Sequence, residues 1–375
     1  QVIIGKISDN VWFWNGRRRP FIIIGGLLAS MMLLALPNID VITAALGIKA
    51  ILGVAIVIVL SLDIAINVGF NPTRAIIADV TPEGNDRTRG FTWMQSVSGT
   101  ISVGAYAIGA IFDNIVLIYV GAVLVLLFTL FPPLLVEEPK NIGVTEQNSN
   151  AKPSSGSLKD ILMSIQPLWG ILIYDIYAMG LRLLGIQHEH YYAEMVCGLL
   201  TVMLVIKALT AREHGLEPDA AAGVGFRKVL AAHSFSWIGI HTTFVFMFIY
   251  IQAVMTALDG TQAGRVTTLA FLILNAVAAV LPVLVLGPVA KVIGRVKTHA
   301  GSLAIMTFGY IGLLVFGTTP TAIYMLMAIV GIGWASMVSL PFAIMSQKVD
   351  QAQMGLYMGL FNLSVVLPQL IVSLG

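Results

Sequence analysis

Long segments without a charged side chain dominate this sequence. No Lys, Arg, Asp or Glu occurs between Thr298 and Gln347, and such a segment is long enough for two bilayer-spanning helices of about 20 residues each. Of the 375 residues, 57% are hydrophobic and 11% are charged, whereas soluble domains contain roughly 25% charged residues. The chain therefore has too few polar groups to cover a surface that faces water. We predict an all-α membrane protein that crosses the bilayer many times.

Further apolar windows predict the individual spans. They cover residues 20–38, 48–73, 90–112, 115–136, 161–186, 191–210, 229–255, 266–290, 299–317, 322–346 and 354–375. The apolar segment Gln1–Ile4 is expected to be the end of an earlier span. We accordingly expect the first and the last helix of the fold to lie outside this chain.

Basic residues predict the orientation of these spans. One predicted side of the membrane collects Lys6, Arg17, Arg18, Arg19, Arg87, Arg89, Lys140, Lys152, Lys159, Arg212, Arg227, Lys228, Lys291, Arg295, Lys297 and Lys348. The other side has only Lys49, Arg265 and Arg182. Cytoplasmic loops carry the excess of Lys and Arg, so the first side is predicted to be cytoplasmic, in the plasma membrane or a bacterial inner membrane. The basic residues are spread over short loops, and no nucleic-acid partner is expected.

A polar segment divides the chain into two membrane halves. Residues 137–160 are rich in Ser, Asn, Lys and Pro and are predicted to be a flexible cytoplasmic linker between an N-terminal half, 1–136, and a C-terminal half, 229–375. Residues 161–228 are predicted to hold an inserted helix pair and a cytoplasmic loop. A single re-entrant hairpin is the alternative for this insertion, since charged residues interrupt its apolar pattern at Asp175, Arg182 and Glu194.

The expected span 48–73 contains the most informative polar residues. Asp63, Asn67, Asn71 and Arg74 are spaced so that they share about 80° of a helix surface. A charged side chain in mid-membrane costs at least ~2.5–3.5 kcal/mol, which is tolerated where the residue faces a partner or a water-filled cavity. A buried carboxyl also gains and loses a proton near neutral pH. We therefore predict that Asp63 binds a proton, with a structural role as a cap or helix partner as the alternative. For Arg74, a functional role and snorkelling to the interface remain open.

Uncharged polar residues on other predicted spans could complete a cavity. Singly, each such residue is more typical of helix packing or of the membrane interface. Together they predict polar contacts to a substrate from Gln95, Trp237, His241, Asn362 and Gln369. No metal site, cofactor site or catalytic group stands out, because the spacing of His188 and His190 does not match a zinc-binding helix. We therefore do not expect an enzyme.

Two sequence motifs resemble a known family. The first is Gly5-Lys6-Ile7-Ser8-Asp9 followed, after six residues, by Gly16-Arg17-Arg18-Arg19-Pro20-Phe21-Ile22. It is similar to the lengthened loop between the second and third helices of major facilitator transporters of the sucrose–proton symporter branch, which are glycoside-pentoside-hexuronide-like cation symporters. The second is Leu62-Asp63-Ile64-Ala65 followed by Asn67, Pro72, Arg74-Ala75 and Ala78-Asp79, which resembles the fourth helix of that branch.

This resemblance implies a function and several roles. The fold would consist of two helical halves, here with two extra helices between them, and the protein would carry a disaccharide such as sucrose or maltose together with a proton. The proton gradient would supply the energy, and the partners would be the sugar, protons and the lipid bilayer. Asp63 would couple the proton, Arg74 would assist transport, and the gating residues would be Asp9, Arg17, Arg18, Arg19, Asp79, Asp259 and Arg265. The family commonly has an acid after the last of these, whereas this chain has Val266. The alternatives are transport of a non-sugar solute and a membrane scaffold or pigment-handling protein without coupled transport.

Overall fold

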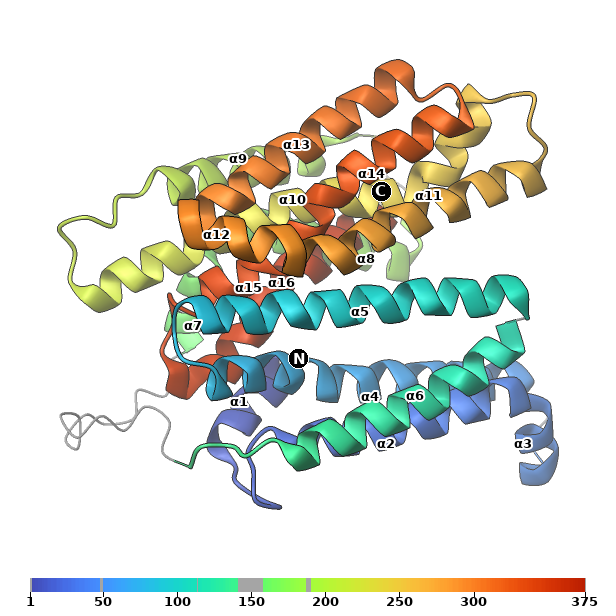
Figure 1. Ribbon diagram of the computed structural model, residues 1–375, viewed down its shortest axis with the longest axis horizontal. Coiled ribbons are helices and arrows are strands. Elements are labelled where there is room, and N and C mark those ends of the chain that lie inside the picture. The colour runs from blue at the N-terminus through green and yellow to red at the C-terminus, as the bar shows by residue number, and fades with distance from the viewer. Residues whose placement is uncertain (1, 48–49, 113, 141–157, 187–189, 375) are drawn as a thin grey trace. The chain divides into compact units, whose positions relative to one another are not determined.

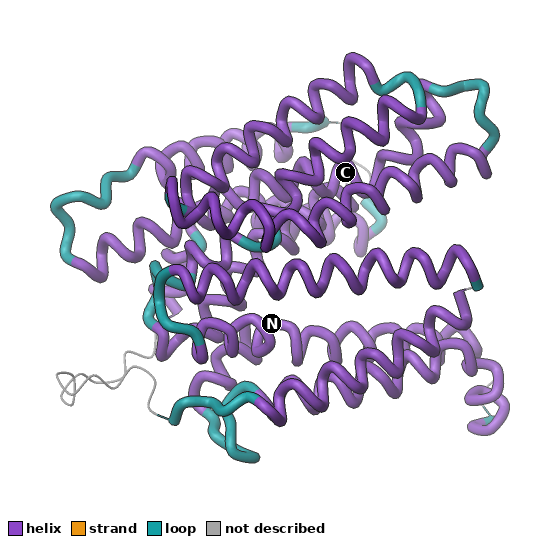
Figure 2. The backbone as a smooth tube through the Cα atoms, in the orientation of Figure 1, coloured by secondary structure: helices purple, strands orange, loops and turns teal. Residues whose placement is uncertain are grey.

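The computed structural model describes residues 2–47, 50–112, 114–140, 158–186 and 190–374. Within these ranges all regular structure is helical, as the tube in Figure 2 shows, and an isolated bridge between Phe13 and Gly16 is the only strand-like pairing. The predicted all-α fold class is confirmed. The chain forms two compact units, which are described separately below. Unit 1 comprises Gln1–Gly90, Thr100–Gly143 and Gln351–Gly359, and unit 2 comprises Phe91–Gly99, Val144–Asp350 and Leu360–Gly375.

Unit 1 is built on the helices of the N-terminal part of the chain. They are α1 (Val2–Asn10), α2 (Arg19–Ala35), α3 (Ile39–Leu46), α4 (Ile51–Val80), most of α5 (Asn85–Ile111) and α6 (Asn114–Leu135), with the short 3₁₀ turns η1 (Leu36–Asn38) and η5 (Gln351–Gln353). In the blue-to-green part of Figure 1, α2 lies beside both α4 and α6.

Small residues allow α2 to approach both of its neighbours. A Cβ atom added at Gly25 would lie 2.7 Å from the backbone oxygen of Ala65 on α4, and one at Gly26 would lie within the side chain of Thr129 on α6. Membrane helices associate through this kind of close contact, because lipid tails are as apolar as the helix surfaces and give no hydrophobic driving force. The glycines of α2 therefore set how closely this helix packs against α6 and against α4, the helix that carries Asp63.

Unit 2 contains the inserted pair and the C-terminal part of the chain. Its helices are α7 (Leu158–Ser164), η3 (Gln166–Leu168), α8 (Trp169–Leu184), α9 (Tyr192–Thr210), α10 (Pro218–Val254), α11 (Gly260–Leu281), the π-helical turn η4 (Pro282–Leu286), α12 (Gly287–Ile293), α13 (Arg295–Phe316), α14 (Pro320–Met337), α15 (Leu340–Met345) and α16 (Met354–Leu374), whose first residues belong to unit 1. The orange helices α13 and α14 run side by side (Figure 1).

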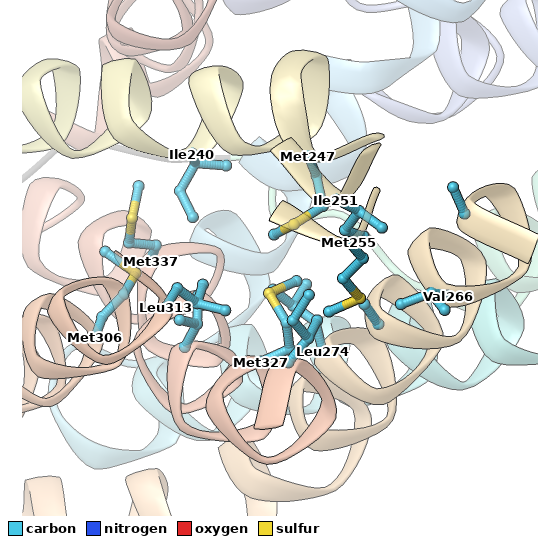
Figure 3. Packing of buried hydrophobic residues seen from close by; sticks show 14 residues of the cluster. Ile240, Met247, Ile251, Met255, Val266, Leu274, Met306, Leu313, Met327 and Met337 are labelled. Carbon is cyan, nitrogen blue, oxygen red and sulfur yellow. The ribbon is translucent and has the colours of Figure 1, made fainter. Parts of the chain in front are cut away.

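A methionine-rich core joins four of these helices. Figure 3 shows Met247 of α10 near Leu274 of α11 and Met327 of α14, with Met306 of α13 beside Met337 in the same cluster. Thioether side chains fill irregular gaps between helices more easily than branched side chains do. Close helix contacts add to this packing, since a Cβ atom at Gly333 would lie 2.3 Å from the side chain of Met306.

The described chain contains 10 helices that are long and apolar enough to cross a membrane. Both inserted helices, α8 and α9, belong to this group. The predicted span 90–112 is the helix α5, but this helix is not among the 10. Its first turns carry Asp86, Arg87 and Arg89, and its middle is rich in hydroxyl side chains, so its composition is less apolar.

Two predicted boundaries of the insertion are wrong. The segment 218–228, assigned to a cytoplasmic loop, is the beginning of α10, which starts at Pro218. Proline is well tolerated in the first turn of a helix, where its missing N–H has no intrahelical partner to lose. The span predicted to start at residue 161 instead corresponds to the candidate span Gln166–Leu184, which begins with the turn η3 that separates the short α7 from α8.

Candidate functional site

The polar stripe of α4 begins with a hydrogen-bonded pair. The Asn67 side-chain amide donates to the Asp63 carboxylate over 3.1 Å and to the Asp63 backbone oxygen over 2.8 Å. This pair forms because residues four apart lie on one helix face. The opposite face, with Ala65 and Gly69, packs against Gly25 of α2. Asp63 therefore points away from α2, and its side chain is exposed on the protein surface of unit 1.

The other end of the stripe is more enclosed. Asn71 is fully buried, and neither its amide nitrogen nor its amide oxygen has a hydrogen-bond partner. Arg74 is half-buried, and its guanidinium lies 3.9 Å from the centre of the Phe70 ring. A cation over an aromatic face is stabilised by the ring quadrupole. The helix continues through Pro72 to Val80, so the four polar residues stay on one continuous helix with different exposure.

A second polar group lies on α10 in unit 2. The Trp237 indole N–H donates to Nε2 of His233 over 2.9 Å, and Nδ1 of His233 lies 2.7 Å from Oγ of Ser364 on α16. Because indole can only donate, Nε2 of His233 is an acceptor and the ring proton is on Nδ1. His241 packs on the Trp237 ring, with ring centres 4.9 Å apart, and its Nε2 lies 3.3 Å from the Val365 backbone oxygen.

Sequence reasoning missed His233 and Ser364, which orient Trp237. The helical spacing of His233 and Trp237, four residues apart, was the available signal. An aromatic group extends from this pair, because the Trp334 ring lies edge-on to the Trp237 ring with centres 5.4 Å apart. The indole N–H of Trp334 is buried and has no hydrogen-bond partner. An aromatic surface with an unused donor is thus present in unit 2.

The remaining predicted substrate contacts differ in how deeply they are buried. Gln95 and Asn362 are buried within unit 2. Gln369, which shares a helix face with Asn362 by spacing, is exposed. Pro368 lies between the two residues, inside α16, and neighbouring helices cover only the earlier position. The structure therefore does not give these two amides a common environment.

The predicted gating residues of unit 1 form a buried ion cluster. Arg18 has no exposed surface, and its guanidinium contacts Asp9 at 2.6 Å, Asp79 at 2.9 Å and the Ser8 hydroxyl at 2.5 Å. Arg17 contacts the other oxygen of Asp79 at 3.0 Å. This arrangement brings together residues from α1, α4 and the loop before α2, and Arg18 is its centre.

Asp9 also binds the first turn of α16. Its carboxylate accepts the backbone N–H groups of Gly355 at 2.8 Å and Leu356 at 2.7 Å. These groups lack partners within the helix, and the helix dipole favours a negative charge at this end. Gly5 makes the approach possible, since a Cβ atom there would collide with the Gly355 backbone oxygen. Asp9 consequently connects Arg18 to α16.

Burial and charge act in opposite directions on this cluster. Burial raises the pKa of Asp9 above its usual range, and it outweighs the opposing effects of Arg18 and the two N–H groups. Burial lowers the pKa of Arg18, but the carboxylates of Asp79 and Asp9 outweigh it, and the pKa of Arg18 lies above its usual value. The cluster is thus held together by mutual charge compensation in a dry environment.

Glu138, which sequence reasoning missed, clamps the beginning of α2. Its carboxylate accepts the backbone N–H groups of Arg17 at 2.9 Å, Arg18 at 2.9 Å and Arg19 at 2.8 Å. The contribution of Arg19 is therefore through its backbone. A negative group before the first turn of a helix satisfies donors that would otherwise lack partners. The signal in the sequence was a pair of acids followed by a proline, directly after the span 115–136.

The predicted gating residues Asp259 and Arg265 lie at the beginning of α11. Asp259 caps α11 by accepting the Gln262 backbone N–H at 2.8 Å, while the Gln262 side chain accepts the Asp259 N–H at 3.1 Å. Both residues are in the described part of the chain, where no ion pair joins Asp259 to Arg265. The reciprocal cap is a local stabiliser of a helix start.

Among the described residues, no group of three His, Cys, Asp or Glu side chains could hold a metal ion. His188, whose spacing from His190 was considered above, lies outside the described residues.

Comparison with known protein families gives a match over almost the whole chain. The sequence pattern of the Major Facilitator Superfamily matches residues 1–373. A search of curated proteins finds no match to the chain.

Proposed function

The chain belongs to the major facilitator superfamily, and from this premise we propose that it imports a sugar, a disaccharide such as sucrose or maltose, together with a proton. It is a multi-pass integral membrane protein of a family of secondary transporters, not of enzymes. We propose the substrate, the coupling ion and the roles of the site residues. The observation that carries it is the hydrogen-bonded pair of Asp63 and Asn67 on α4.

Asp63 is the proposed proton carrier. Its helix is one of the 10 membrane-crossing candidates, and its carboxyl accepts a hydrogen bond from an amide rather than from a cation. Asp and Glu residues within membrane-spanning segments mark proton relays in many transporters, and this is the role proposed for Asp63. The Asn67 amide orients the carboxyl, and both groups can exchange hydrogen bonds with sugar hydroxyls. Proton and sugar would thus compete for, or share, the same oxygen atoms.

Unused buried polar atoms support a substrate with hydroxyl groups. The Asn71 amide and the Trp334 indole N–H are buried without hydrogen-bond partners. Each such group costs about 1–3 kcal/mol if it stays unsatisfied, so a ligand or water is expected to satisfy it. Sugars offer hydroxyls to amides and a flat apolar face to aromatic rings, and Trp237 presents such a ring beside Trp334.

The ion cluster around Arg18 is the proposed cytoplasmic gate. Two of its contacts, the hydrogen bonds from Gly355 and Leu356 to Asp9, join α16 to α1. Alternating access needs a contact that forms in one state and breaks in the other. Charge-assisted hydrogen bonds suit this purpose, since water can replace them when the cluster opens. Arg74 and Gln95 are proposed as further substrate contacts, as are His241, Asn362 and Gln369.

The test measures sugar-dependent proton movement. The full-length protein is reconstituted in proteoliposomes, and external pH is followed on adding sucrose, maltose or glucose to wild type and Asp63→Asn. We expect sugar-dependent alkalinisation that disappears in the variant. Asp40→Asn is the matched control, because Asp40 is an exposed aspartate on α3. Full accumulation by Asp63→Asn would refute its coupling role. No pH change with any of the three sugars, in folded protein, would refute the sugar assignment and favour another solute or a role without transport.

A further inference from the structure

The inserted pair α8 and α9 is a packed unit of its own. A Cβ atom at Gly170 would lie 2.2 Å from the Thr201 hydroxyl and 2.7 Å from the Cys197 backbone oxygen, so the two helices touch closely there. In an antiparallel pair, four residues onward on α8 correspond to four residues back on α9. Tyr174 of α8 is therefore level with Cys197 of α9.

Asp175 lies on the buried face of α8. It follows Leu168 and Ile171 along one helix stripe, and these three residues are at most 2% exposed. It is near the middle of the candidate span Gln166–Leu184. Neither of its carboxyl oxygens has a hydrogen-bond partner. An aliphatic residue would serve packing at this position better, because a buried polar group without partners is unfavourable.

The charged and titratable groups around Asp175 supply no close cation. Tyr174 precedes Asp175 on α8 and lies within electrostatic range of Asp175, of Glu194 and Cys197 on α9, and of Arg182. Arg182 is on the same stripe, about 10 Å further along the helix by the rise per residue. No ion pair joins Arg182 to Asp175 within the described chain.

The free-energy cost of burying this carboxyl differs greatly between its ionised and its protonated state. An ionised carboxylate loses several kcal/mol of hydration when it is buried, and only a close cation or donors can replace that hydration. A neutral carboxylic acid loses far less. The packed arrangement of α8 and α9 is therefore compatible with the acid and not with the isolated anion.

We propose that Asp175 is a proton-binding site of the inserted helix pair, separate from the Asp63 pair on α4. The bound ligand is one proton, held by a carboxyl group at the interface of α8 and α9. The pair packs fully when the proton is bound. Losing the proton requires water to reach the carboxylate, and this loosens the contact between the two helices. The proposal needs no assumption about the transported substrate.

The first experiment compares stability over pH. Unfolding temperatures of the full-length protein in nanodiscs are measured from pH 5.5 to 8.5 for wild type and Asp175→Asn. Asparagine has the shape of the neutral acid but never ionises. We expect the variant to gain several degrees relative to wild type as pH rises. Asp219→Asn, which alters an exposed aspartate at the start of α10, is the control and should follow wild type. A gap between Asp175→Asn and wild type that is the same at every pH would overturn the proposal.

A chemical label locates the proton without any variant. Dicyclohexylcarbodiimide dissolves in the bilayer, takes the proton of a carboxylic acid on its nitrogen and binds the carboxyl oxygen at its central carbon. Mass spectrometry should find this adduct on Asp175 at pH 6, and at least fivefold less of it at pH 9. If Asp175→Asn does not fold, the labelling of the wild-type protein tests the proton site on its own. No adduct at Asp175 at any pH would then overturn the proposal.

Discussion

Arg18 is the side chain on which the cytoplasmic ion cluster depends most. Replacing it by methionine keeps most of the apolar volume but removes three contacts, to Asp9, Asp79 and Ser8. Two carboxylates, whose side chains are at most 5% exposed, then lose their shared cation. Breaking a buried ion pair from one side costs about 3–5 kcal/mol. Arg18→Met should therefore destabilise unit 1 by about that amount.

The loss of stability in Arg18→Met is limited by the contacts that the two carboxylates keep. Asp79 keeps its contact with Arg17 at 3.0 Å, and Asp9 keeps the two N–H groups of α16. Those remaining charge-assisted bonds, each contributing about 1.5–3 kcal/mol, prevent a larger loss. Arg17→Met is the matched control. It removes a single contact, and Asp79 keeps Arg18, so a loss of about 1.5–3 kcal/mol is expected.

The assay is unfolding by SDS in mixed micelles, followed by circular dichroism. Adding Asp79→Asn to Arg18→Met removes one of the stranded charges and should recover part of the stability, which the double-mutant cycle measures as a coupling of at least about 1 kcal/mol. The reasoning is refuted if Arg18→Met costs no more than Arg17→Met, or if the cycle shows no coupling. Either result would mean that water already reaches the cluster.

Two further predictions concern other contacts. Gly26→Ala places a methyl group within the Thr129 side chain, so it should cost about 1–3 kcal/mol of stability in the same assay. Adding Thr129→Gly should restore part of this loss. Equal stability of Gly26→Ala and wild type would contradict the close contact between α2 and α6. Hydrogen bonds from Lys348 and Lys228 hold the pKa of Glu213 below its usual 4.5. This lowered pKa stabilises the fold above about pH 4.5, and the contribution is lost as pH falls through the folded-state pKa. Glu213→Gln should therefore cost under about 1 kcal/mol at pH 7 and progressively less as the pH is lowered below 4.5, whereas a pH-independent difference would exclude the ion pairs as its cause.

Local periodicity was sufficient for several parts of the site. Residues four apart meet on any helix, so the contact between Asp63 and Asn67 follows from their spacing alone. The resemblance implied that Asp9 and the arginine cluster are gating residues, and the opposite charges of Asp9 and Arg18 allow the ion pair that the structure contains. The lengths of the uncharged segments predicted the helical membrane fold, because a bilayer admits few other structures for such segments.

Sequence-distant contacts decided the rest. The bonds from Gly355 and Leu356 to Asp9 join positions 346 and 347 residues apart, and no local pattern encodes such a pairing. Which of three consecutive arginines becomes the buried centre depends on where α1 and α4 place their carboxylates. Similarly, helix spacing put Asn362 and Gln369 on one face, but the neighbouring helices bury only the first.

Asp175 illustrates the division most clearly. In the sequence it is one of three charges that interrupt an apolar segment, and periodicity does not say whether it faces lipid, water or protein. Its burial follows from the packing of α8 on α9, which Gly170 permits. The sequence by itself thus determined the class of protein and the composition of each helix face. The tertiary structure decided which faces are covered, and hence which polar groups lack water and must find partners or protons, because burial is a property of neighbouring helices and not of a single segment.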